Sequence, residues 1–147
     1  MRVFADRLAE TLNRQWHRCY LVFGNEPLFV QESRDLIIRH ARQLGFEEHH
    51  RFSVDSSLDW NDVYDCTQAL SLFSSKQIIE LSIPESGINA AIAKQLLEIS
   101  SHLHEDIIVI ITGTKLTRAQ ESAKWFKALN GCLVSCAALM SNTSLNG

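Results

Sequence analysis

A strand, a glycine turn and the start of a helix occupy residues 19–30, where a nucleotide-binding α/β fold places its phosphate-binding loop. Such a loop needs a second glycine followed by Lys-Ser or Lys-Thr, because backbone amides and the lysine hold the phosphates and the hydroxyl holds Mg²⁺. Here the turn reads GNEPLFVQES, with one glycine, no lysine, the acidic Glu26, and Pro27, which lacks an amide hydrogen. We therefore expect no triphosphate to bind, and we interpret Gly24 as a turn residue.

Other residues that could do chemistry lack partners at suitable spacing. The apolar run at 106–112 ends in Thr112 and Gly113, so it supplies no acid at its carboxyl end. A metal site would need a third ligand beside a histidine pair. None is indicated, so we expect solvated histidines and no metal or other cofactor. The two histidine pairs are His49 with His50 and His102 with His104.

The four cysteines form no C-x-x-C pair, and most stand within apolar, strand-like runs. This pattern indicates buried free thiols without a metal and without a disulfide. The residues are Cys19, Cys66, Cys132 and Cys136.

Composition limits the partners and the location. The chain has 147 residues, 46% of them hydrophobic and 21% charged, as expected for one globular domain. Its net charge of −3 gives no overall basic field for nucleic acid. No apolar run approaches the roughly 18 residues that a membrane span needs. The first residues lack the apolar centre of a secretory signal. We expect a cytoplasmic protein that has no membrane partner.

Strand-like and helix-like segments alternate along the chain, which predicts an α/β fold with a parallel sheet covered on both faces, in three layers. Asp59 and the capping box TRAQ (117–120) mark helix starts, and Gly45 marks a helix end. We expect one domain over residues 1–136 and a polar tail over 137–147. Strands are predicted at 19–23, 51–54, 77–83, 106–112 and 132–136, and helices at 5–14, 27–44, 60–70, 88–103 and 117–131.

The segment LSLFSS (70–75) places two large apolar side chains between the helix at 60–70 and the next strand. At about 100° per residue, Leu72 and Phe73 lie about 140° and 120° from the centre of the buried stripe of that helix, on opposite sides. Both would then project into solvent. Alternatively, the chain bends at Ser71 and both enter the core. The stripe consists of Trp60, Val63, Tyr64, Thr67 and Leu70.

The hexapeptide QALSLF (68–73) resembles the peptide with which bacterial proteins bind the sliding DNA clamp. It occurs together with GNEPLFVQES, GFEEHHRFSVD, DWNDV and KLTRAQESAKWFKAL, in matching order and spacing. Together these motifs resemble the N-terminal domain of the delta subunit of bacterial DNA polymerase III, a clamp-loader subunit. The resemblance extends from Met1 to about Cys136, and the residues after it match nothing recognisable.

The resemblance implies a degenerate AAA+, P-loop NTPase-like domain without a working phosphate loop. It implies binding to the beta sliding clamp, with Leu72 and Phe73 as the protruding pair, and stabilisation of an open ring. Gln68 and Leu70 match the motif less decisively. Such a subunit is not an enzyme by itself. It is a component of the DNA polymerase III holoenzyme, a DNA-directed DNA polymerase (nucleotidyltransferase) complex. It joins the other clamp-loader subunits through downstream domains that the resemblance does not reach.

Two other functions remain open from the residues alone. A small nucleotide-dependent enzyme could use the same α/β scaffold, although the lysine-free turn disfavours it. A DNA-binding domain is disfavoured by the acidic balance, but Arg34, Arg39 and Arg42 could form a local basic patch. We expect little direct DNA binding.

Overall fold

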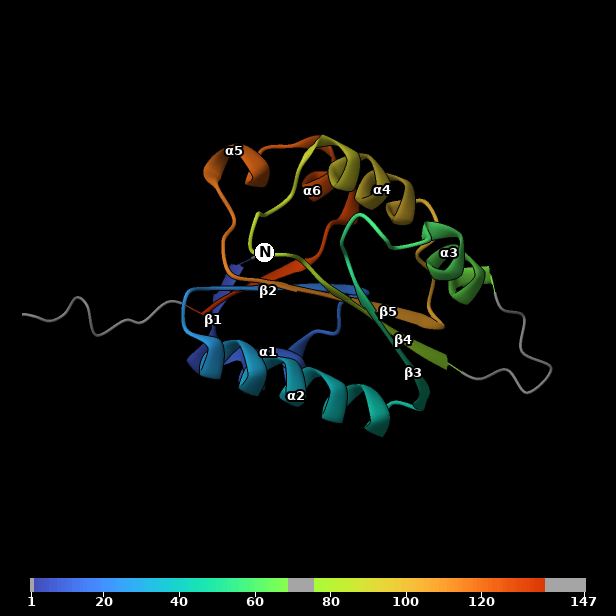
Figure 1. Cartoon of the computed structure of the whole chain (residues 1–147). Helices are drawn as coiled ribbons and strands as arrows, with labels where there is room; N and C mark the ends of the chain where they lie inside the picture. Colours follow the sequence, from blue (N-terminus) through green and yellow to red (C-terminus); the bar gives the residue numbers. More distant parts are fainter. Residues whose placement is uncertain (1, 69–75, 137–147) are drawn as a thin grey trace, which may run out of the picture.

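A single parallel sheet forms the centre of the protein (Figure 1). The structure is a computed structural model and describes residues 2–68 and 76–136. Within these ranges the strand order is β1-β6-β2-β5-β4-β3, and every neighbouring pair is parallel. The strands are β1 (Arg2–Phe4), β2 (Cys19–Phe23), β3 (Phe46–Ser53), β4 (Lys76–Ser82), β5 (Ile107–Gly113) and β6 (Cys132–Ser135).

Helices cover both faces of this sheet, so the predicted three-layer α/β fold is confirmed (Figure 1). One face carries the short 3-10 helix η1 (Ala5–Arg7), α1 (Leu8–Arg14) and α2 (Pro27–Gln43). The other face carries α3 (Trp60–Gln68), α4 (Ala90–Ser100), α5 (Arg118–Glu121) and α6 (Lys124–Leu129).

No helix within the described ranges is long and apolar enough to cross a membrane.

The central strands are continuous apolar runs because helices bury both of their faces. Successive residues alternate between two clusters. Leu21 of β2 and Ile111 of β5 pack toward α3, α4 and α6. Tyr20 and Ile110 pack toward α1 and α2. Each of these four side chains is completely buried, so the sheet is fixed from both sides.

Several local signals act as the sequence predicts. Pro27 is the first residue of α2, and Gly45 follows the helix with φ +98°. The Asp59 carboxylate accepts a hydrogen bond from the Asn61 amide at the start of α3. Thr117 and its partner Gln120 form both bonds of a capping box at α5.

Four differences between the predicted and the observed elements have a physical reason. The short edge strand β1 was missed because three residues carry too little pattern, yet it pairs with β6. Strand β3 begins at Phe46 instead of residue 51, and as an edge strand it can be polar. The helix predicted at 117–131 divides in two because Ala123 is extended. The helix predicted at 88–103 is shorter, since Asn89 caps it.

Candidate functional site

A crevice opens at the carboxyl ends of β2, β5 and β6, the edge at which parallel α/β sheets bind ligands. Its lining includes Gly24 and Asn25 from the loop between β2 and α2, and Lys115 from the loop after β5. Among the described lining residues, the only lysine therefore comes from a different loop than the one a phosphate loop would occupy. The crevice lies at the edge of the sheet where a nucleotide would bind, but the β2–α2 loop supplies no lysine.

Two backbone amides of the β2–α2 loop already have protein acceptors. The Gly24 amide donates to the Gly113 carbonyl at 3.2 Å, and the Glu26 amide donates to the Cys136 carbonyl at 3.3 Å. Pro27 has no amide hydrogen to offer. A phosphate loop needs such amides free and pointed at the ligand, so two main donors are already engaged.

Gly24 has a role that the sequence interpretation missed. A Cβ atom at this position would lie 2.1 Å from the carbonyl oxygen of Cys136. Its φ is not in the left-handed region, where only Gly45 and Gly87 lie among the glycines in the described ranges. Gly24 is therefore required by the close approach of two backbones, and a turn conformation is not the reason.

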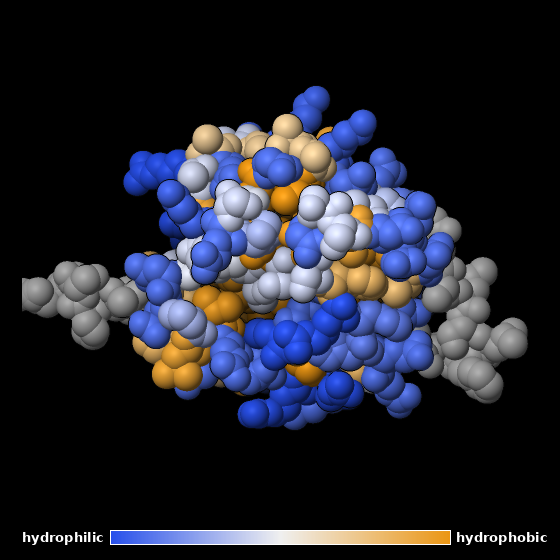
Figure 2. Space-filling view, in the orientation of Figure 1, coloured by the Kyte–Doolittle hydropathy of each residue, from blue (hydrophilic) through white to orange (hydrophobic). Residues whose placement is uncertain are grey.

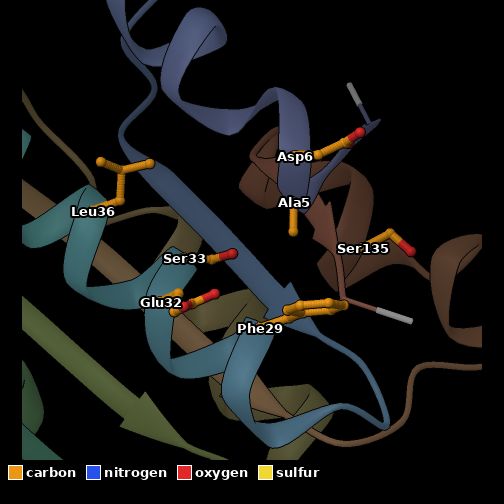
Figure 3. Close-up of a pocket in the computed structure, with 7 residues that line it drawn as sticks. All are labelled: Ala5, Asp6, Phe29, Glu32, Ser33, Leu36 and Ser135. Atoms are coloured by element: carbon orange, nitrogen blue, oxygen red, sulfur yellow. The ribbon is translucent and has the colours of Figure 1, made fainter. Parts of the chain in front are cut away.

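A second cavity, of about 350 Å³, lies between η1, α2 and the end of β6 (Figure 3). Phe29 and Leu36 form its apolar wall, and Asp6 and Glu32 add carboxylates. Leu28, in the first turn of α2, is 56% exposed. Figure 2 shows an apolar area at the lower left, on the side of the molecule where α2 begins in Figure 1. The seven lining residues, all of them described, include no histidine or lysine that could activate a serine nucleophile.

Helix α3 carries the start of the predicted clamp-binding motif. Val63 and Thr67 are buried, and Trp60 and Tyr64 pack against the same core cluster, so the predicted buried stripe of α3 is confirmed as far as Thr67. Gln68 is the last residue of α3. The other three predicted site residues, Leu70, Leu72 and Phe73, lie outside the described residues.

A charged cluster that the sequence analysis did not predict lies on the face of the sheet that α2 covers. Glu80 of β4 is 3% exposed and accepts hydrogen bonds from Arg34 of α2 and from His49 of β3, the latter at 2.9 Å. Arg51 adds a contact at 3.3 Å. The expectation of solvated histidines is thus wrong for His49. Burial alone would raise the pKa of Glu80, but the hydrogen bonds from Arg34 and His49 outweigh it and lower that pKa.

The charged cluster around Glu80 also removes one arginine from the predicted basic patch. Arg34 is engaged by Glu80 and by Asp35, so its guanidinium is not free to bind a phosphate backbone. Arg39 and Arg42 remain exposed on α2. Two arginines alone provide little electrostatic attraction for the phosphate backbone of DNA.

The cysteines behave as thiols of a protein core. Cys19, Cys132 and Cys136 are buried, as predicted, whereas Cys66 is half-buried. Burial raises the pKa of Cys19 to about 12, with a further contribution from Cys132. Within the part of the chain that the structure describes, no group of three or more metal-binding side chains comes together.

Comparisons with known proteins agree with the motif pattern. The family model for the DNA polymerase III delta subunit matches residues 20–137. The delta subunit of Escherichia coli (strain K12) is 46% identical over 129 residues, which are 88% of this chain and 38% of that protein. The delta subunit of Haemophilus influenzae is 37% identical over 129 residues, 88% of this chain and 37% of that protein. The chain thus spans less than half the length of these curated relatives.

Solved structures show the same fold at low identity. The Bacillus subtilis DNA clamp loader delta protein matches with a TM-score of 0.62 and 12% identity, over 90% of this chain and 42% of that one. Saccharomyces cerevisiae RIF2 matches with a TM-score of 0.51 and 13% identity, over 90% and 53% of the two chains. The family match covers most of the described sheet and confirms the resemblance seen in the motifs. This chain belongs to the DNA polymerase III delta subunit family.

Proposed function

We propose that this chain is the clamp-binding module of a clamp loader in DNA replication. It contacts the beta sliding clamp through Leu72 and Phe73, with Gln68 and Leu70 as supporting residues. The observation that carries the proposal is the QALSLF motif, which begins at the last residue of α3 in a chain of the delta family. Contacts with other clamp-loader subunits belong to the parts of the longer relatives that this chain does not span.

The geometry of α3 supports an outward direction for the Leu-Phe pair. Its buried stripe through Val63 and Thr67 is already used to pack the helix on the sheet. If the helical count of α3 continued, Leu72 and Phe73 would lie on either side of that stripe, away from the core. Two neighbouring large apolar groups with a flanking amide are suited to a pocket on a partner protein.

Ring opening in this proposal uses binding free energy and no hydrolysis. A ligand shifts a closed-to-open equilibrium only by the difference between its affinities for the two states. The module would therefore bind the clamp surface more tightly when one interface of the ring is open.

The module itself has no ATP site in this proposal. The β2–α2 loop has no lysine, and its Gly24 and Glu26 amides are engaged by Gly113 and Cys136. These facts disfavour the alternative of a nucleotide-dependent enzyme. Titration calorimetry with Mg-ATP should show no binding heat, and a micromolar site would contradict this part of the proposal.

The clamp contact is tested by Leu72→Ala and Phe73→Ala. Truncating a well-packed hot-spot residue costs about 2 kcal/mol or more, so clamp affinity should fall about thirtyfold or more. The melting temperature should be nearly unchanged, because exposed truncations change stability by about 0.5 kcal/mol or less. Leu28→Ala removes an exposed leucine from the opposite layer and should leave clamp affinity unchanged.

A core location for the pair predicts the reverse result. Either truncation would then cost about 2–5 kcal/mol of stability. Unchanged stability together with unchanged clamp affinity would end the proposed role of the pair.

A further inference from the structure

Two hydrogen bonds join the turn between α4 and β5 to the elements on either side of the proposed clamp-binding segment. His104 Nε2 lies 3.2 Å from the carbonyl oxygen of Thr67, the residue before the last one of α3. The Gln77 amide, at the start of β4, donates to the Asp106 carbonyl oxygen at 2.9 Å. The same turn, His104–Asp106, therefore holds the helix that precedes the segment and the strand that follows it.

A third hydrogen bond determines which nitrogen of the neutral His104 ring carries the proton. The Asp106 amide donates to His104 Nδ1 at 3.1 Å. A ring nitrogen accepts a hydrogen bond only when it carries no proton, so the proton of the neutral ring is on Nε2. Nε2 is the atom that faces Thr67, and its N–H donates to the Thr67 carbonyl.

The N–H group of His104 lies at the C-terminal end of α3, where the helix has carbonyl groups without a partner inside it. The last four carbonyls of an α-helix have no partner within the helix. The Thr67 hydroxyl donates back to the Tyr64 carbonyl at 2.7 Å, and His104 satisfies the carbonyl of Thr67 itself. Gln68, the first residue of the QALSLF motif, follows directly.

We propose that His104 is a positioning residue for clamp binding, and this inference rests on the proposed function. It acts without touching the clamp, by holding the last turn of α3 and with it the direction in which the motif leaves the helix. Without the His104 donor the last turn opens more readily, and the clamp must order it again on binding. Affinity falls for that reason, while the core of the protein is unaffected.

Three substitutions of one residue separate the hydrogen bond from the rest of the ring. His104→Ala removes the donor and should weaken clamp binding about three- to tenfold, the effect of one net hydrogen bond. His104→Gln can place an amide donor near the position of Nε2 and should restore most of the affinity. His104→Asn keeps an acceptor for the Asp106 amide but is too short to reach Thr67, so it should bind as weakly as the alanine variant.

A matched control distinguishes local positioning from general stability. Asn89→Ala removes the cap bond to the Ile92 amide at the far end of α4 and should lower the melting temperature without changing clamp affinity. His104 is exposed, so its variants should melt like the wild type. Amide hydrogen exchange should become faster in the last turn of α3 in His104→Ala but not in Asn89→Ala.

The outcomes also separate this inference from the proposed function. If Leu72→Ala abolishes clamp binding and His104→Ala binds like the wild type, positioning by His104 is refuted and the proposed function stands. Equal weakening by the alanine and glutamine variants would refute the hydrogen bond as the cause. If Leu72→Ala and Phe73→Ala both bind normally, the proposed function itself fails.

Discussion

Replacing Glu80 with glutamine should destabilise the protein strongly although the side chain keeps its size. Both carboxylate oxygens of Glu80 accept hydrogen bonds: one from Arg34 Nε, and the other from His49 Nε2 at 2.9 Å. Arg51 Nε forms an ion pair with the second oxygen at 3.3 Å. A glutamine amide has only one accepting oxygen. Whichever way the amide is turned, its NH₂ group must face a donor from α2 or β3.

The expected loss in the free energy of unfolding depends on how exposed the partners of Glu80 are. Removing one partner of a fully buried ion pair costs about 3–5 kcal/mol. Here the carboxylate is 3% exposed, but the Arg34 and Arg51 side chains are 19% and 67% exposed, so water can rehydrate them in part. We therefore expect a loss of about 2–3 kcal/mol in the free energy of unfolding at pH 7, between that of a charged hydrogen bond and that of a buried pair.

The loss should depend on pH with a defined sign. The hydrogen bonds from Arg34 and His49 lower the pKa of folded Glu80 below its ordinary value of 4.5, against the opposing effect of burial. The stabilisation is therefore complete above about pH 4.5 and is lost as the pH falls through the lower, folded pKa. The glutamine variant cannot titrate, so the difference between the two proteins should shrink over that acidic range.

Urea unfolding of both proteins from pH 7 to pH 3 measures this difference directly. Glu98→Gln is the matched control, because the Glu98 side chain is 60% exposed and its contact with His102 is 3.5 Å. It should change stability by about 0.5 kcal/mol or less. A loss below that value for Glu80→Gln at pH 7, or a loss that does not change with pH, would refute the reasoning.

Two further predictions use other parts of the fold. Gly24→Ala should cost at least the upper end of the roughly 1–3 kcal/mol typical of overpacking, because its Cβ would lie 2.1 Å from the Cys136 carbonyl oxygen. Gly87→Ala, with φ +87° and open space around it, should cost only about 1 kcal/mol, and equal losses in a denaturant titration would contradict the steric argument. In the native protein a thiol reagent should label the half-buried Cys66 before Cys19, whose pKa is raised to about 12 by burial, and mass spectrometry of timed samples would reveal the reverse order.

The sequence alone determined the features that depend on neighbouring residues. Apolar runs identified four of the five predicted strands, because a strand covered on both faces is apolar at most positions. The capping box at Thr117 and the proline at the first position of α2 marked helix starts, because a cap acts within three or four residues. The absence of a lysine in GNEPLFVQES and the QALSLF motif were equally readable from the chain. The predicted roles of Leu72 and Phe73 stay predictions.

Only the tertiary structure decided the features that join distant segments. Gly24 resembles any turn glycine until the end of β6 brings the Cys136 carbonyl against it. Glu80 has the strand pattern of its neighbours, and Arg34 and His49 reach it only because α2 and β3 pack beside β4. His104 ends a helix-like segment in the sequence, and only the fold brings its ring within hydrogen-bond distance of the Thr67 carbonyl in the last turn of α3. Sequence patterns record local periodicity, whereas these contacts arise when the sheet order brings separate segments together.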